Sequence, residues 1–148
     1  MEDEAVFAAF GMHMVGGFLV VPVNVELDDD YALGLRKAIL HKVRDASPKG
    51  VLFDVSVLRI LDTFSFSILA DTGKMVSMLG VEVVFVGFQP GVASAVVDLG
   101  LDVGGIQSAV SMDDGFALLR SRALRRFEPQ EEESGAALMD LRDAPGDF

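Results

Sequence analysis

Residues 51–71 read VLFDVSVLRILDTFSFSILAD, and the rest of the fold can be worked out from this stretch in both directions. The first five residues form a short apolar run that only Asp54 interrupts, a pattern typical of a strand covered on both faces. Asp62 and Thr63 belong to the residue types that favour the start of a helix. A buried strand that leads into a helix is the repeating unit of an α/β fold.

The helix predicted from residue 62 onward contains both apolar and polar positions. We expect its large apolar residues to form the buried side, namely Phe64, Ile68, Met75 and Leu79. Ser67, Asp71 and Lys74 would then lie on the opposite side, and Gly80 would end the helix.

Upstream of residue 51, the sequence predicts a hairpin and then a helix. Gly16-Gly17 separates two apolar runs, Phe10–Val15 and Phe18–Val25, and such a glycine pair favours a tight hairpin turn. Three aspartates at 28–30 precede a segment in which larger side chains recur every four positions, namely Tyr31, Leu35, Ile39 and Val43. Because acidic residues stabilise a helix N-terminus, a helix is expected from these aspartates to about Ser47.

Downstream of residue 80, the same signals recur. Val81–Val86 predicts a buried strand, Pro90 suits the first position of a helix, and Ile106–Val110 predicts a short strand. Ser111 and Asp114 stand at the two positions of a capping box before a last helix. The sequence therefore predicts an α/β fold with a mixed, mostly parallel sheet, opened by the N-terminal hairpin, and four helices packed mainly on one face.

The formal net charge of −11 is unevenly distributed over the 148 residues. Residues 5–127 contain 13 acidic and 11 basic residues, whereas residues 128–148 contain 7 acidic residues and 1 basic residue. An acidic surface repels the phosphate backbone, so we expect no nucleic-acid partner. We predict a flexible N-terminus over residues 1–9, one domain over residues 10–127 and an acidic, disordered tail over residues 128–148.

The chain has no cysteine, which excludes disulfides and thiolate chemistry. Its densest apolar stretch, near residues 15–25, is interrupted by Pro22 and Asn24 and is too short to span a bilayer. The N-terminus begins with acidic residues and lacks the basic segment of a signal peptide. We therefore expect a cytoplasmic protein that does not bind membranes.

Short segments in a fixed order, between about Gly17 and Arg126, carry a resemblance to a known family. They are VELDD at 25–29, VLFDV at 51–55, LDTF at 61–64, LAD at 69–71, GFQPGVA at 87–93 and DLGL at 98–101. The set resembles the STAS domain family. Within that family it looks like the RsbS-like scaffolds of the stressosome, which are related to the anti-sigma factor antagonists.

The resemblance implies a regulatory scaffold that is not an enzyme and needs no cofactor. The family has an Asp-Ser or Asp-Thr pair at the start of the second helix, whose hydroxyl is the target of a kinase, and Asp62-Thr63 matches this pair. Thr63 is thus the implied phosphorylation site, and the implied partner-binding residues around it are Asp62, Phe64, Ser67 and Asp71.

The resemblance also implies the partners. An RsbT-like serine/threonine kinase would be sequestered by the scaffold and released by phosphorylation. RsbR-like STAS proteins would join the scaffold in a homo- or hetero-oligomer.

The sequence departs from the family pattern at four points. Thr63 stands where RsbS-like proteins usually have serine. Ala95 stands where stressosome relatives often carry a second threonine, so we expect no second phosphorylation site there. The short N-terminal segment leaves no room for the sensory domain of RsbR-like proteins, which favours the RsbS-like branch. The acidic tail is not part of the pattern.

Several residues also have simpler interpretations. Asp62 or Thr63 would serve equally well as an ordinary helix cap. The aspartates at 28–30 fit a helix start better than a calcium loop, because no glycine turn or later glutamate completes such a loop. His13 and His41 lack the spacing of metal ligands, so no metal is expected, whereas a Ser–His–Asp triad is compatible with any sequence spacing.

The sequence is also compatible with two other functions, and one cluster of basic residues has two possible roles. The chain is also compatible with a simple anti-sigma factor antagonist that binds an anti-sigma kinase without assembling. A small α/β enzyme acting on a nucleotide or phosphate ester would need a pocket with converging polar groups. Four arginines at 120, 122, 125 and 126 either complement the dipole of the last helix or bind an acidic partner, for which the acidic tail is one candidate.

Overall fold

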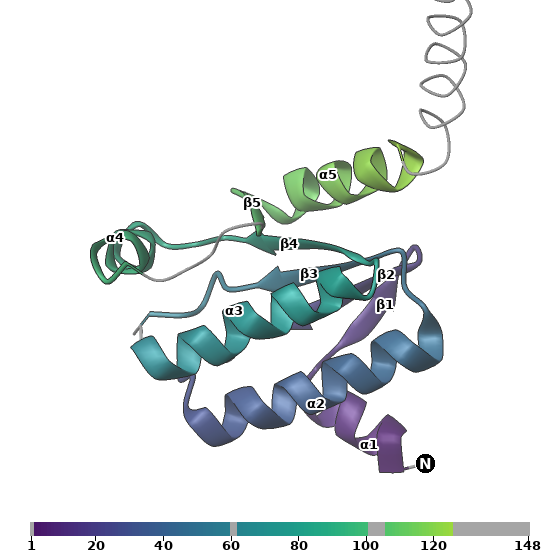
Figure 1. Cartoon of the computed structure of the whole chain (residues 1–148), viewed down its shortest axis with the longest axis horizontal. Coiled ribbons are helices and arrows are strands. Elements are labelled where there is room, and N and C mark those ends of the chain that lie inside the picture. The colour runs from purple at the N-terminus through teal and green to yellow at the C-terminus, as the bar shows by residue number, and fades with distance from the viewer. Residues whose placement is uncertain (1, 60–61, 101–105, 126–148) are drawn as a thin grey trace, which may run out of the picture.

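The computed structural model describes residues 2–59, 62–100 and 106–125 (Figure 1). The tail predicted over residues 128–148 lies outside the described residues. The elements, in chain order, are α1 (Glu2–Ala9), β1 (His13–Val15), β2 (Phe18–Pro22), α2 (Asp29–Ala46), β3 (Gly50–Asp54), α3 (Thr63–Met78), β4 (Glu82–Val86), α4 (Pro90–Asp98), β5 (Gln107–Ala109) and α5 (Met112–Arg125).

The five strands form one sheet in the order β1-β2-β3-β4-β5. β1 pairs antiparallel with β2, and the remaining neighbours are parallel. Gly16 and Gly17, with φ of 57° and 88°, form the turn between β1 and β2. A two-residue hairpin turn with both residues at positive φ matches the twist of the strands, and glycine adopts it without steric cost. The predicted hairpin and mixed, mostly parallel sheet are confirmed.

The helices lie on both faces of the sheet (Figure 1). α2 and α3 connect consecutive parallel strands and cover the same face of the sheet. This is expected when successive crossover connections have the same handedness. α5 follows the last strand and packs on the opposite face, and α4 lies beyond the carboxyl end of β4. The predicted fold class is confirmed, but the structure has one helix more than expected, because residues 2–9 form α1 and pack against α2.

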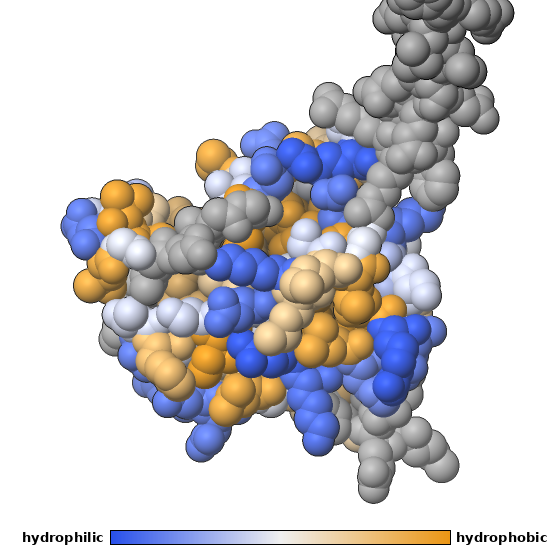
Figure 2. Space-filling view, viewed as in Figure 1, coloured by the Kyte–Doolittle hydropathy of each residue, from blue (hydrophilic) through white to orange (hydrophobic). Residues whose placement is uncertain are grey.

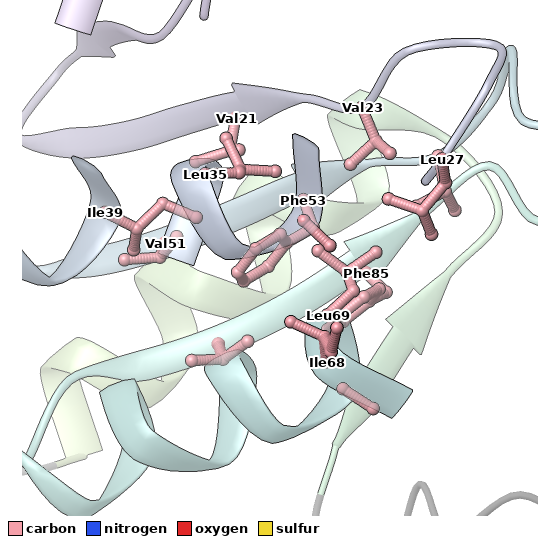
Figure 3. Packing of buried hydrophobic residues seen from close by; sticks show 14 of the residues in the cluster. Val21, Val23, Leu27, Leu35, Ile39, Val51, Phe53, Ile68, Leu69 and Phe85 are labelled. Carbon is pink, nitrogen blue, oxygen red and sulfur yellow. The ribbon is translucent and has the colours of Figure 1, made fainter. Parts of the chain in front are cut away.

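The core has one hydrophobic cluster on each face of the sheet. In β2, Leu19 and Val21 belong to the larger cluster with α2 and α3, whereas Phe18 and Val20 face α5 on the other side. This alternation follows from the two-residue period of a strand. The larger cluster is centred on Phe53 and Phe85, whose rings stack 4.6 Å apart (Figure 3).

The buried side predicted for α3 was largely wrong. Ile68 is buried as expected, but Phe64 is 62% exposed, and Met75 and Leu79 are exposed as well. The face turned towards the core consists of smaller or differently placed residues, among them Ser65, Phe66, Leu69, Thr72, Gly73 and Val76. The helix approaches the sheet so closely at Gly73 that a Cβ there would lie 3.2 Å from the Phe85 ring. Close packing therefore selects small residues, which a search for large apolar side chains overlooks.

α5 also packs closely on its face of the sheet, which generates a test of the fold. A Cβ at Gly115 would lie 2.5 Å from Val86 Cγ1 and 3.0 Å from Leu52 Cδ1. We expect Gly115→Ala to lower the free energy of unfolding by about 1–3 kcal/mol through overpacking, although alanine favours a helix. Gly91→Ala in α4 is the control, because no heavy atom lies within 4 Å of a Cβ there, and it should be neutral or stabilising. Urea unfolding measures both, and equal stabilities would contradict the packing of α5.

Candidate functional site

The starts of α2 and α3 lie together at the carboxyl end of the parallel strands. Each helix begins with an aspartate cap: Asp28 accepts a hydrogen bond from the Tyr31 backbone N–H at 2.8 Å, and Asp62 accepts one from that of Phe64 at 3.4 Å. The aspartates predicted to open these helices therefore do so. The free N–H groups of the first turn give this end of each helix a partial positive charge.

Thr63 is the first residue of α3 and is exposed. Its backbone carbonyl accepts a hydrogen bond from the Ser67 hydroxyl at 2.8 Å. Within the described part of the chain, no hydrogen bond engages the hydroxyl of Thr63 itself. The hydroxyl is therefore available to a group that approaches from solvent.

Ser65 joins the starts of the two helices and was not recognised from the sequence. It is fully buried, and its hydroxyl lies 2.7 Å from Asp29 Oδ1 and 2.7 Å from Asp62 Oδ2. A hydroxyl has one proton to donate, so the two carboxylates share a single donor. The bridge holds α2 and α3 together at their first turns and places two carboxylates close to Thr63. The spacing of Asp62 and Ser65 could have suggested half of this bridge, but nothing local points to Asp29.

A second polar contact fixes α3 further along. The guanidinium group of Arg36 in α2 donates to Thr72 Oγ1 at 3.0 Å and to the Ile68 carbonyl at 2.9 Å. Thr72 is buried and donates to the same carbonyl at 2.7 Å. With the Ser65 bridge, this contact fixes α3 against α2, so the outer face of α3 is presented in one orientation.

The outer face of α3 contains three of the five candidate residues. Thr63, Ser67 and Asp71 recur every four positions and therefore lie on one side of the helix. Thr63 and Asp71 are exposed, whereas Ser67 is half-buried with its hydroxyl turned back to the first turn. Met78, 87% exposed, lies at the far end of the helix.

The other two candidates, Asp62 and Phe64, lie beside Thr63 at the helix start. Two further apolar side chains, Val25 and Val57, are exposed in the loops at the same end of the sheet. Exposed aromatic rings that are surrounded by polar residues are common in protein interfaces. Val97 in α4 is also exposed. Apolar surface is visible over α4 at the left of Figure 2.

The loop before α2 is held by Tyr31. Its phenol oxygen accepts a hydrogen bond from the Asn24 N–H at 3.1 Å and donates to the Pro22 carbonyl at 3.4 Å. Burial raises the pKa of Tyr31 above its ordinary value of 10.0, against the opposing effect of the Asn24 hydrogen bond. The phenol therefore stays protonated over the physiological range and keeps its donor.

The cavity beside the first turns of α3 is apolar. A cavity of about 170 Å³ lies nearby, between α3, α4 and the last two strands. Among the described residues, its lining consists of Phe66, Phe85, Phe88 and other apolar side chains, with Ser108 as the one polar residue. Within residues 2–59, 62–100 and 106–125, no group of three metal-ligating side chains occurs. The two histidines lie apart in the fold, His13 in β1 and His41 in α2, where His41 contacts Asp45 at 3.3 Å.

These features define a small α/β domain that presents two joined helix starts on its surface. The STAS domain model matches residues 10–110, and the chain therefore belongs to the STAS domain family. No curated protein matches the chain.

Solved structures extend this result. RsbS from Moorella thermoacetica, in a serine-to-glutamate variant, is 27% identical over 76% of this chain and 95% of its own, with a TM-score of 0.67. A chain from the molecular architecture of the stressosome, described as a signal integration and transduction hub, is 27% identical to this protein. The match covers 76% of this chain and 97% of that one, also with a TM-score of 0.67. The anti-sigma factor antagonist SpoIIAA, in its unphosphorylated form, shares the fold at 14% identity and a TM-score of 0.60. The match covers 74% of this chain and 95% of SpoIIAA. The family and the two stressosome likenesses support a regulatory role for this domain.

The helices in the described residues are all too short or too polar to cross a membrane.

The Ser65 bridge generates a prediction about stability. Ser65→Ala removes the shared donor and leaves two carboxylates close together, so we expect a loss of about 1.5–3 kcal/mol in the free energy of unfolding. The loss should shrink at high salt, because salt screens the repulsion between the carboxylates.

Ser67→Ala is the matched control for this prediction. It removes a hydroxyl from the same helix that bonds only to a carbonyl one turn back, so it should change stability little. Urea unfolding of both variants at low and high salt is the measurement. If Ser65→Ala is no less stable than Ser67→Ala, the bridge does not join the helices.

Proposed function

We propose that this protein is a non-enzymatic scaffold of a stressosome-like signalling complex. In this role it binds and sequesters an RsbT-like serine/threonine kinase and assembles with RsbR-like STAS proteins. Phosphorylation of Thr63 releases the kinase. The observation that carries the proposal is the exposed Thr63 hydroxyl, without a partner in the described residues, at the start of α3 beside the exposed Phe64.

The contact surface in this proposal is formed by Asp62, Phe64, Ser67 and Asp71. Phe64 supplies apolar contact area, and the carboxylates of Asp62 and Asp71 suit basic groups on the kinase. The polar contacts between α2 and α3 keep this surface in one arrangement before binding, which lowers the entropy that association costs.

Phosphorylation changes the charge of this surface. The kinase transfers the γ-phosphoryl group of ATP to the Thr63 oxygen, ADP leaves, and the hydroxyl proton passes to a base on the kinase. The phosphate adds roughly −1.5 to −2 charges beside the carboxylates that Ser65 holds together. A kinase docked over Phe64 would then have to desolvate three neighbouring anions, so the complex is weakened.

The proposal predicts how Thr63 variants bind the kinase. We expect Thr63→Glu to weaken capture of an RsbT-like kinase from the same genome by about tenfold or more, since it places a carboxylate in the interface. Thr63→Gln has a similar size without the charge and should bind nearly as well as the parent. With ATP and Mg²⁺, mass spectrometry should find phosphate on Thr63 in the parent protein and not in Thr63→Ala. Equal affinities of the Glu and Gln variants would argue against release by charge.

Light scattering on the same samples tests the scaffold part of the proposal. A particle far larger than one chain, formed alone or with RsbR-like proteins, supports a scaffold. A small species that still binds a kinase would indicate a simple anti-sigma factor antagonist instead.

Phe64 gives a separate prediction. Phe64→Ala should weaken kinase binding by about 1–3 kcal/mol, because buried aromatic side chains dominate interface energies. The free energy of unfolding should change little, since the ring is already 62% exposed. Met78→Ala, at the opposite end of α3, is the control and should leave affinity unchanged. Isothermal titration measures both, and an unchanged affinity of Phe64→Ala would remove this end of α3 from the interface.

A further inference from the structure

The amino end of the sheet contains a groove that has no part in the function proposed above. It lies where the hairpin turn, the α2–β3 loop and the last turns of α5 meet, and its volume is about 550 Å³. Phe18, Pro48, Ala123 and Leu124 supply its apolar surface, and Lys49 and Arg120 supply its two cations. The groove is therefore apolar with positive charges.

The two cations lack a partner within the described part of the chain. No ion pair there joins Lys49 or Arg120 to a carboxylate, and both side chains are exposed. Glu82, which starts β4 at this end of the sheet, forms an ion pair with Arg122 instead, with 3.6 Å between Glu82 Oε2 and Arg122 Nη1. Leu124 is also 62% exposed, so the groove presents unpaired positive charge next to uncovered apolar surface.

We propose that residues 128–148 of the same chain occupy this groove. This segment has 7 acidic residues and 1 basic residue, and its Leu138, Met139 and Leu141 form an apolar group among them. It therefore combines negative charge with apolar side chains, which complements the groove in both respects. The acidic residues pair with Lys49 and Arg120, and the apolar group covers Leu124 and Ala123.

The segment that follows α5 is long enough to reach the groove. Leu124 lies in the last turn of α5, and Leu138 follows fourteen residues later. A chain of that length reaches up to about 45–50 Å, far more than a return to the end of the same helix requires. A tethered segment also has an effective concentration in the millimolar range, so weak contacts are enough to keep it bound.

The absence of cysteine allows a direct test on the full chain. A nitroxide label on Ser134→Cys broadens the amide signals of residues near it in a ¹⁵N spectrum. We expect broadening at residues 16–18, 49 and 50, and its loss in 1 M salt, where charges are screened beyond about 3 Å. It should also be lost in Lys49→Glu/Arg120→Glu and in Leu138→Ser/Leu141→Ser.

Two controls make the result specific. Lys37→Glu/Arg59→Glu makes the same charge change at exposed positions outside the groove and should leave the broadening intact. A mixture of ¹⁵N-labelled chain without nitroxide and unlabelled chain with nitroxide should show no broadening at the groove. Broadening in that mixture would show that a second copy fills the groove, and no broadening at residues 16–18, 49 and 50 in the labelled chain would show that the segment does not bind there. Either result overturns the proposal.

Discussion

The arrangement of the functional surfaces depends on the order of the parallel strands. Because β2, β3, β4 and β5 follow one another across the sheet, α2, α3 and α4 all begin at its carboxyl end. The ends of α2 and α3 and the last turn of α5 are correspondingly collected at the amino end. The helix dipoles therefore point the same way, with their positive ends at the carboxyl end of the sheet and their negative ends at its amino end. The charged side chains follow this division: Asp28, Asp29 and Asp62 cap or follow the helix starts, and Lys49 and Arg120 lie at the opposite end.

The Ser65 bridge converts this general arrangement into a specific site. Two neighbouring helix starts would each tolerate an aspartate, but their carboxylates would repel one another. One buried hydroxyl placed between Asp29 and Asp62 supplies a donor and locks the two helices in register. The cost is a local excess of negative charge next to Thr63, and that excess is what makes a phosphate at Thr63 an effective switch in the proposed function.

Local signals were enough to predict most elements, and long-range packing explains the failures. The glycine pair at 16–17, the aspartate caps and Pro90 each fix a turn or a helix start by their own chemistry, so the hairpin and the starts of α2, α3 and α4 were predictable. α1 was not expected, because its contacts come from α2: Lys42 Nζ lies 4.2 Å above the Phe7 ring. The exposure of Phe64 and the partnership of Ser65 with Asp29, 36 positions away, depend on how closely α2 and α3 pack.

The separation of the two ends also determines how the two proposals relate. A phosphate on Thr63 lies at the carboxyl end of the sheet, whereas the groove between α5 and the hairpin lies at the amino end, a whole strand length away. At physiological ionic strength, a charge on the surface is largely screened beyond about 8 Å. Direct electrostatic coupling between the phosphate and the acidic segment is therefore weak, and each surface can be engaged without the other. A scaffold built this way can regulate kinase binding at one end while a segment of its own chain occupies the groove at the other.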